Sequence, residues 1–177
     1  IRPKLSINVG ALLGHSLIRI FVMGEDAQKR EATPEEIEKM CRIVEEAMDA
    51  GAIGISMSVM GPAGNSHVDA DGTSMPTDAM DHEAILEIGR AVVERGEGVI
   101  QMIAQIAFFG DRSITERMAE MAKGTGVRVI HNTFLTSDLL GHMVAEDLAW
   151  LDEQRAAGRD LTVGCLLNRG WVEAGIH

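Results

Sequence analysis

Apolar residues recur along this chain in two alternating spacings, one typical of amphipathic helices and one typical of buried strands. The clearest helical stretch is "TPEEIEKMCRIVEEAMDAG", in which Thr33 is the N-cap, Pro34 opens the helix and Glu36 completes a capping box. Its apolar residues fall on one face: Ile37, Met40, Cys41, Val44 and Met48. We therefore expect a helix that begins at Pro34 and stops before Gly51, which suits a helix end.

The same order of helix and strand repeats along the chain. The stretches "DHEAILEIGRAVVERG", "SITERMAEMAKGTG" and "AEDLAWLDEQRAAG" are helical in pattern, and each precedes an apolar run with few charges. The expected strands are at about Leu5 to Leu12, Ile53 to Met57, Val99 to Gln105, Val129 to Phe134 and Leu161 to Leu167. This alternation predicts an α/β fold with parallel β/α units. A doubly wound open sheet and a (β/α)8 TIM barrel both fit the pattern.

Composition narrows the function classes. At 177 residues and 46% hydrophobic content, residues 1–177 are expected to form a single β/α domain. The net charge of −11 argues against a nucleic-acid partner, because phosphate binding needs clustered cations. Apolar runs are too short to span a membrane, and no leader pattern is present. Cys41 and Cys165 show no paired spacing, which indicates a reducing, cytoplasmic setting.

Polar residues gather where the expected strands end, which is where α/β folds place their sites. These residues are His15, Ser56, Ser58, Gln101, Gln105, His131 to Thr133, Asn168 and Arg169. No glycine-rich phosphate loop follows any strand, so nucleotide binding lacks its usual motif. We expect a substrate site for a small molecule at these strand ends.

Four blocks of the sequence resemble a known family. "NVGALLGHSLIR", "VMG", "ATPEEIEKM" and "EEAMDAGAIGISMS" are similar, in order and spacing, to the middle portion of amidohydrolase superfamily members of the D-aminoacylase or N-acyl-D-amino-acid deacylase type. The block "LAWLDEQRAAGRDLTVGCLLNRG" resembles a subgroup of that family. The resemblance implies a TIM barrel whose middle strands this chain holds. It also implies metal-assisted hydrolysis of the amide of an N-acyl amino acid or related compound.

The chain departs from the family's metal centre. The resemblance implies a divalent metal such as zinc, held by an early His-x-His pair, a bridging ligand and a late aspartate, and none of these segments is present. Ile103 and Thr133 stand where central-strand histidines are expected, and His131 lies two residues early. Because catalytic zinc needs three protein ligands, we expect no metal site in this chain and no metallohydrolase activity from the chain alone; its catalytic residues stay unknown.

The candidate substrate-binding residues are His15, Ser56, Gln105, His131, Asn168 and Arg169. His15 lies in a Gly-His-Ser turn, where donation to a backbone carbonyl is the favoured role. His131 either lines the barrel interior or is a hydrogen-bonded core residue. Arg169 suits a substrate carboxylate or a surface ion pair. The acidic stretch with Asp69, Asp71 and Asp78 is expected to be a solvated loop.

Two functions stay open at this point. One is an amidohydrolase-like enzyme, a hydrolase of carbon–nitrogen bonds, incomplete or inactive as the isolated chain. The alternative is a non-catalytic binding or scaffold subunit derived from the same barrel. In either case we expect the open strand edges to be covered by the rest of a longer chain or by a homo-oligomer.

Overall fold

The computed structural model describes residues 8–61, 72–78, 80–106, 109–134 and 141–165. Its helices are α1 (His15–Met23), α2 (Pro34–Asp49), α3 (His82–Val93), α4 (Ser113–Ala122) and α5 (Gly141–Ala156), with a 3-10 turn η1 (Gly24–Gln28). Its strands are β1 (Leu12–Gly14), β2 (Gly54–Ser58), β3 (Gly98–Ile103), β4 (Gln105–Ile106), β5 (Phe109–Gly110), β6 (Val127–Phe134) and β7 (Leu161–Cys165).

Five strands form one parallel sheet in the order β1-β2-β3-β6-β7, and β4 and β5 form a separate antiparallel pair. The α/β class and the parallel β/α units are therefore confirmed. Each strand of the main sheet lies beside the next one along the chain, with no reversal of order. A doubly wound sheet reverses its order at a switch point, whereas a barrel adds strands in sequence. The observed order therefore fits a barrel sector.

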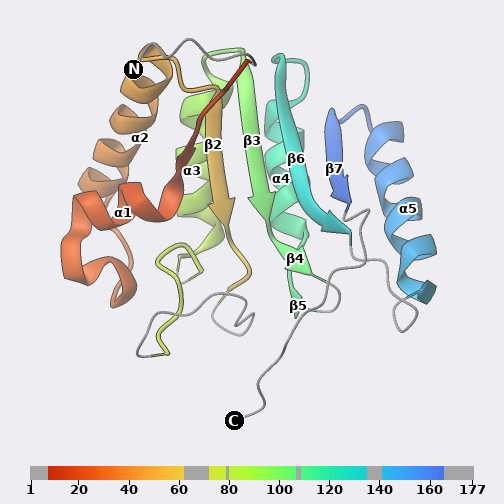
Figure 1. The fold of residues 1–177 in the computed structure, drawn as a ribbon, viewed down its shortest axis with the longest axis horizontal. Helices are drawn as coiled ribbons and strands as arrows, with labels where there is room; N and C mark the ends of the chain where they lie inside the picture. The colour runs from red at the N-terminus through yellow and green to blue at the C-terminus, as the bar shows by residue number, and fades with distance from the viewer. Residues whose placement is uncertain (1–7, 62–71, 79, 107–108, 135–140, 166–177) are drawn as a thin grey trace.

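One face of the sheet is covered by helices. Figure 1 shows α2, α3 and α4 behind the strands, with no helix across the middle of the front face. Side chains that point toward the helices are almost fully buried: Ile55, Met57, Ile100, Met102, Val127 and Val129. Residues that alternate with them, such as Ser56 and Gln101, are only half-buried. The apolar core thus lies between the sheet and its helices, and the other face is polar and open.

Helix α2 forms as its sequence predicts. Thr33 accepts a hydrogen bond from the Glu36 backbone, and the Glu36 side chain accepts one from the Thr33 backbone. Met40 and Val44 are fully buried against the core. Gly51, just beyond the helix, has a positive φ of 103°, which favours glycine.

Three local predictions are wrong. Of the first strand, expected at about Leu5 to Leu12, residues 5–7 lie outside the described residues; the described strand is Leu12–Gly14, because the ladder with β2 begins at Leu12 and Val9 is exposed. The third strand ends at Ile103, and Gln105 belongs to the small β4–β5 pair. The Gly-His-Ser stretch is no turn, since His15 begins α1 directly after Gly14.

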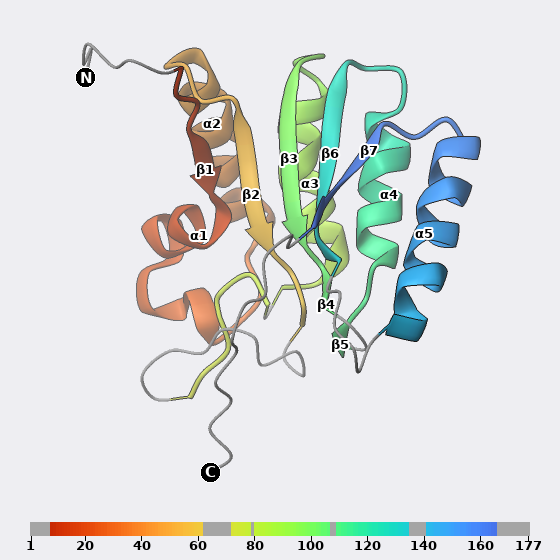
Figure 2. The same ribbon diagram turned by 45° about the vertical axis from the view of Figure 1, so that its right-hand side comes forward.

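The carboxyl ends of the strands meet at one edge of the sheet. Figure 2 shows α1, the β4–β5 pair and the segment after residue 71 gathered at this end. Ser16 of α1 hydrogen-bonds Thr77 at 3.1 Å, and the Met60 backbone donates to Asp78 at 2.7 Å. No helix in the described parts of the chain is both long and apolar enough to cross a membrane.

Candidate functional site

The candidate site is the polar face of the sheet, on the side away from the helices. Parallel pairing places Gly14, Ser56, Gln101, Ile130 and Thr162 in one row across the strands. The next row toward the carboxyl ends contains Ser58, Ile103, Asn132 and Gly164. In barrels this face turns inward and meets the substrate at the carboxyl ends. We refer to these two rows as the open face.

Ser56 and Gln101 are joined at the centre of the open face. The Ser56 hydroxyl donates to Gln101 Oε1 at 2.6 Å, although the residues lie 45 positions apart. The register that sets Ser56 opposite Gln101 brings them together. Ser56 was a predicted substrate-binding residue, and Gln101 was expected only as part of the polar rim.

Ser58 lies one pleat further toward the carboxyl end. Its Oγ is buried and has no hydrogen-bond partner among the described residues. Its register neighbour is Ile103, which in turn pairs with Asn132. Ile103 therefore presents an alkyl group at the position where the family resemblance implies a histidine.

His15 is completely buried at the start of α1. Neither ring nitrogen has a hydrogen-bond partner among the described residues, so the expected bond to a backbone carbonyl is not found. Burial, with a smaller contribution from the Arg19 charge, lowers the pKa of His15 to about 3. The imidazole is therefore neutral at pH 7, and it is fully enclosed by the protein.

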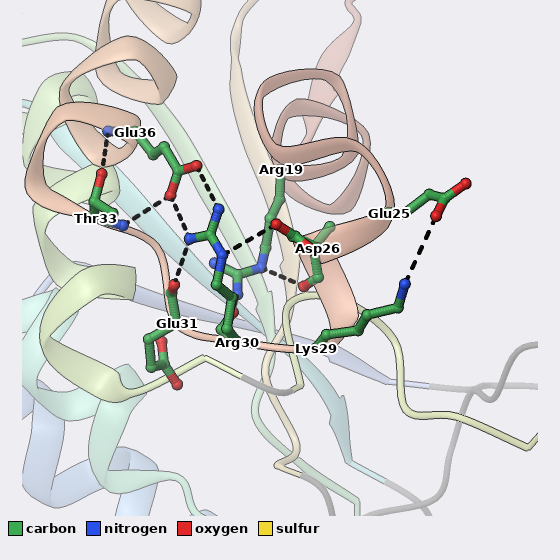
Figure 3. Close-up of polar contacts among 9 residues, drawn as sticks. Arg19, Glu25, Asp26, Lys29, Arg30, Glu31, Thr33 and Glu36 are labelled. Atoms are coloured by element: carbon green, nitrogen blue, oxygen red, sulfur yellow. Dashed lines mark hydrogen bonds and ion pairs between the residues drawn. The ribbon is translucent and has the colours of Figure 1, made fainter.

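Arg19 lies one turn after His15 and ties α1 to the segment that follows. Its Nε donates to the Ala27 carbonyl at 2.7 Å, and its Nη2 donates to the Arg30 carbonyl at 2.6 Å. Arg30 in turn donates to both carboxylate oxygens of Glu36 at 2.8 Å and to Asp26 at 3.2 Å (Figure 3). The Arg30 guanidinium, followed by the Thr33 backbone, lowers the pKa of Glu36 to about 2. This network fixes the connection between α1 and α2 and belongs to the scaffold.

His131 lies on the helix-covered side of the sheet, not in the open face. It is buried, hydrogen-bonds Thr115 of α4 at 3.2 Å, and packs against Phe134 and Trp150. Burial, with a smaller contribution from Arg112, lowers the pKa of His131 to about 4. Of the two positions expected for His131, the structure shows the hydrogen-bonded core rather than the barrel interior: side chains alternate along β6, and His131 shares the side of Val127 and Val129.

The remaining residues singled out in the sequence lie in β4, in a buried loop position or outside the described residues. Gln105 is half-buried in β4, next to the carboxyl end of β3. Asn168 and Arg169 lie outside the described residues, as do Asp69 and Asp71. Asp78 was expected in a solvated loop, but it is buried and holds the Met60 backbone. No sequence pattern predicted a contact of Thr77 or a buried position for Asp78, because the partners of both residues lie on distant elements.

The described residues do not fit a zinc centre. No group of three or more His, Cys, Asp or Glu side chains comes together within the described parts of the chain. His15 and His131 are each buried in separate surroundings, and Ile103 offers no donor atom. A hollow lined by Met48, Ile53 and Arg95 lies at the opposite, amino ends of the strands, where barrels favour stability over catalysis.

Comparison with known proteins identifies structural relatives. No protein-family model and no curated protein sequence matches the chain. Two solved structures of D-aminoacylase, one of them a mutant in complex with copper chloride, match with a TM-score of 0.68 and 25% identity. Each match covers 89% of this chain and 30% of the D-aminoacylase chain. One of these structures is described as defining a subset of the amidohydrolases.

A third structure matches with a TM-score of 0.64 and 22% identity, over 90% of this chain and 31% of the other. It is N-acyl-D-glutamate deacylase from Bordetella bronchiseptica, complexed with zinc and a phosphonate that mimics the tetrahedral intermediate. The resemblance inferred from the sequence is thereby confirmed: the chain has the fold of part of a D-aminoacylase-type amidohydrolase. It spans less than a third of the length of these relatives.

Proposed function

We propose that this chain supplies part of the substrate-binding surface of an amidohydrolase-like TIM barrel that acts on the amide bond of N-acyl amino acids or related small amides. The likeness to D-aminoacylase, at 25% identity over 89% of the chain, carries this proposal. The sequential parallel sheet with one open polar face supports it, because a barrel interior needs that arrangement.

Ser56 is the predicted residue best placed to meet a substrate, since it lies in the open face beside Gln101. Gln105 lies at the same end of the sheet, and Asn168 and Arg169 stay predicted contacts. His15 and His131 are buried and neutral, so in this proposal they support the surface rather than touch the substrate.

Zinc chemistry is not assigned to these residues. Because the described donors do not assemble into a ligand set, we predict that the purified chain binds zinc in clearly less than one equivalent. Elemental analysis after dialysis measures this. One zinc per chain, lost in His131→Ala, would contradict the prediction.

A second candidate function is a non-catalytic binding or scaffold subunit built on the same barrel. The alkyl side chain of Ile103 in the open face favours it, because an alkyl group cannot bind a metal or move a proton. A binding subunit would take the same class of amide without turnover, whereas a scaffold subunit would neither bind nor hydrolyse it.

Measurements of amide hydrolysis and of amide binding distinguish the enzyme from the non-catalytic subunit. The natural polypeptide that contains this chain is incubated with N-acetyl-D-amino acids and their L-enantiomers, with and without added zinc, and release of free amine is measured. Hydrolysis supports the enzyme, and calorimetric binding without hydrolysis supports the binding subunit. Neither hydrolysis nor binding would overturn the proposed substrate-binding function and leave only the scaffold role.

A further inference from the structure

The amide group of Gln101 is held in one orientation by its neighbour. A glutamine side chain ends in one acceptor oxygen and one NH2 group with two donors. Ser56 donates to the oxygen, so the NH2 group faces away from that hydroxyl. On the other side of Gln101 the register neighbour is Ile130, which offers no side-chain acceptor. The two N–H donors have no hydrogen-bond partner among the described residues.

We infer that Gln101, oriented by Ser56, binds a neutral carbonyl oxygen at the open face. The chemistry of the two groups supports this inference, since the NH2 of a primary amide donates hydrogen bonds to a carbonyl oxygen and carries no charge. For the proposed substrates that carbonyl is the acyl group of an N-acyl amino acid, so the ligand's identity rests on the proposed function. Gln101 is a binding residue, and Ser56 is a positioning residue.

The surroundings favour a carbonyl over a carboxylate or phosphate. The two rows of the open face hold no charged side chain among the described residues. Arg128, opposite Val99 and nearer the amino ends, is the cation closest in register, and it pairs with Asp160 at 3.5 Å. Anions are usually bound by the arginine guanidinium or the lysine ammonium rather than by neutral amides.

Two neighbours complete a subsite suited to an acyl group. Ile103, one pleat beyond Gln101 on the same strand, provides apolar surface for an alkyl chain. Ser58 is next to Ile103 in register, and its hydroxyl is buried with no partner among the described residues, so it places a polar group directly beside that apolar surface. The pattern is a neutral donor beside an apolar surface, as small-ligand pockets commonly have.

The test uses the full 177-residue chain labelled with 15N in its glutamine side chains. Three probes are titrated separately: N-methylacetamide, which offers only the carbonyl, acetate, which offers only the carboxylate, and N-acetyl-D-leucine, which offers both. The side-chain NH2 signals of Gln101 are identified by their loss in Gln101→Met. We expect N-methylacetamide and N-acetyl-D-leucine to shift these signals, and acetate to leave them in place.

Variants then measure the contribution of each residue. Gln101→Met conserves side-chain volume and removes the donors, so it should weaken N-acetyl-D-leucine binding roughly fivefold. Ser56→Ala should also weaken binding and change the Gln101 NH2 signals of the unliganded chain. Ser56→Thr keeps a hydroxyl, so its affinity and its NH2 signals should be close to those of the wild type. Glu45→Gln, at an exposed position of α2 outside the open face, is the control and should have no effect.

Each outcome decides between the two proposals. Unchanged affinity in Gln101→Met, or equal shifts with acetate, would overturn the inference and leave the proposed function standing. Shifts with N-methylacetamide but no binding of N-acetyl-D-leucine would support the Gln101 subsite and count against the proposed substrate. Binding of neither amide would overturn both.

Discussion

At the scale of single residues, burial decides what the two central histidines do. An isolated histidine at a strand end suggests a ligand or a base, yet His15 and His131 are both enclosed by the scaffold. Enclosure disfavours the imidazolium, so each pKa falls below the ordinary value of 6.5, to about 3 and about 4. Both rings are therefore neutral through the physiological pH range.

This burial predicts a stability that falls as the protein is acidified. The folded chain takes up fewer protons than the unfolded chain between pH 6.5 and the folded-state pKa values, so acid favours unfolding there. From pH 7 to pH 5 we expect each histidine to lower the free energy of unfolding by about 2 kcal/mol. Urea unfolding at the two pH values measures it.

Substitution isolates each contribution. His131→Leu and His15→Leu should each remove about half of the loss between pH 7 and pH 5, whatever their effect on stability at pH 7. His82→Leu is the matched control, because His82 opens α3 and is only half-buried. If the wild type has the same free energy of unfolding at pH 7 and at pH 5, the two histidines are not buried as neutral rings.

At the scale of elements, α2 illustrates how a local signal fixes a helix start. The Thr33 hydroxyl, the Glu36 carboxylate and the Pro34 ring satisfy or remove backbone donors that the first turn leaves free. Arg30 then binds Glu36 from the preceding segment, so the cap also anchors the connection from α1. These four residues thus cap helix α2 and also anchor the segment that connects α1 to α2.

We predict that Thr33→Ala lowers the free energy of unfolding by about 1 kcal/mol, because a helix donor loses its partner. Thr33→Ser should retain most of the stability, since serine caps equally well. Glu45→Ala, on the exposed side of the same helix, serves as the control and should change little. Equal unfolding midpoints for Thr33→Ala and the wild type would mean that the cap contributes nothing.

At the scale of the whole molecule, the sheet has two outer strands with unpaired edges in the described part of the chain. They are β1 and β7, at the two ends of the strand order. Exposed apolar side chains also gather on α1, where Leu17 is 70% exposed, Ile20 46% and Phe21 81%. Unpaired edges and apolar patches are sites of association in soluble proteins.

The isolated chain is therefore predicted to self-associate. Light scattering at micromolar concentration should report a mass above that of the 19.1 kDa monomer. Leu17→Ser combined with Phe21→Ser should lower the measured mass, whereas exposed Glu45→Ser should not. A wild-type chain that stays monomeric and melts cooperatively would show that the open sheet needs no cover.

The sequence by itself determined the local elements, the α/β class and the family resemblance. Hydrophobic spacing and capping residues act over a few positions, so α2 to α5 and their alternation with the five strands of the main sheet could be predicted without any knowledge of distant contacts, whereas helix α1 and the β4–β5 pair were not predicted.

Only the tertiary structure decided which side chains share a face. A shift of one residue in a strand turns every side chain to the other face, so the side of His131 depended on the pairing of β6 with its neighbours. The same register placed Ser56 against Gln101, 45 residues apart. His15 became the buried start of α1 because the chain turns into a helix directly after Gly14, where β1 ends its pairing with β2.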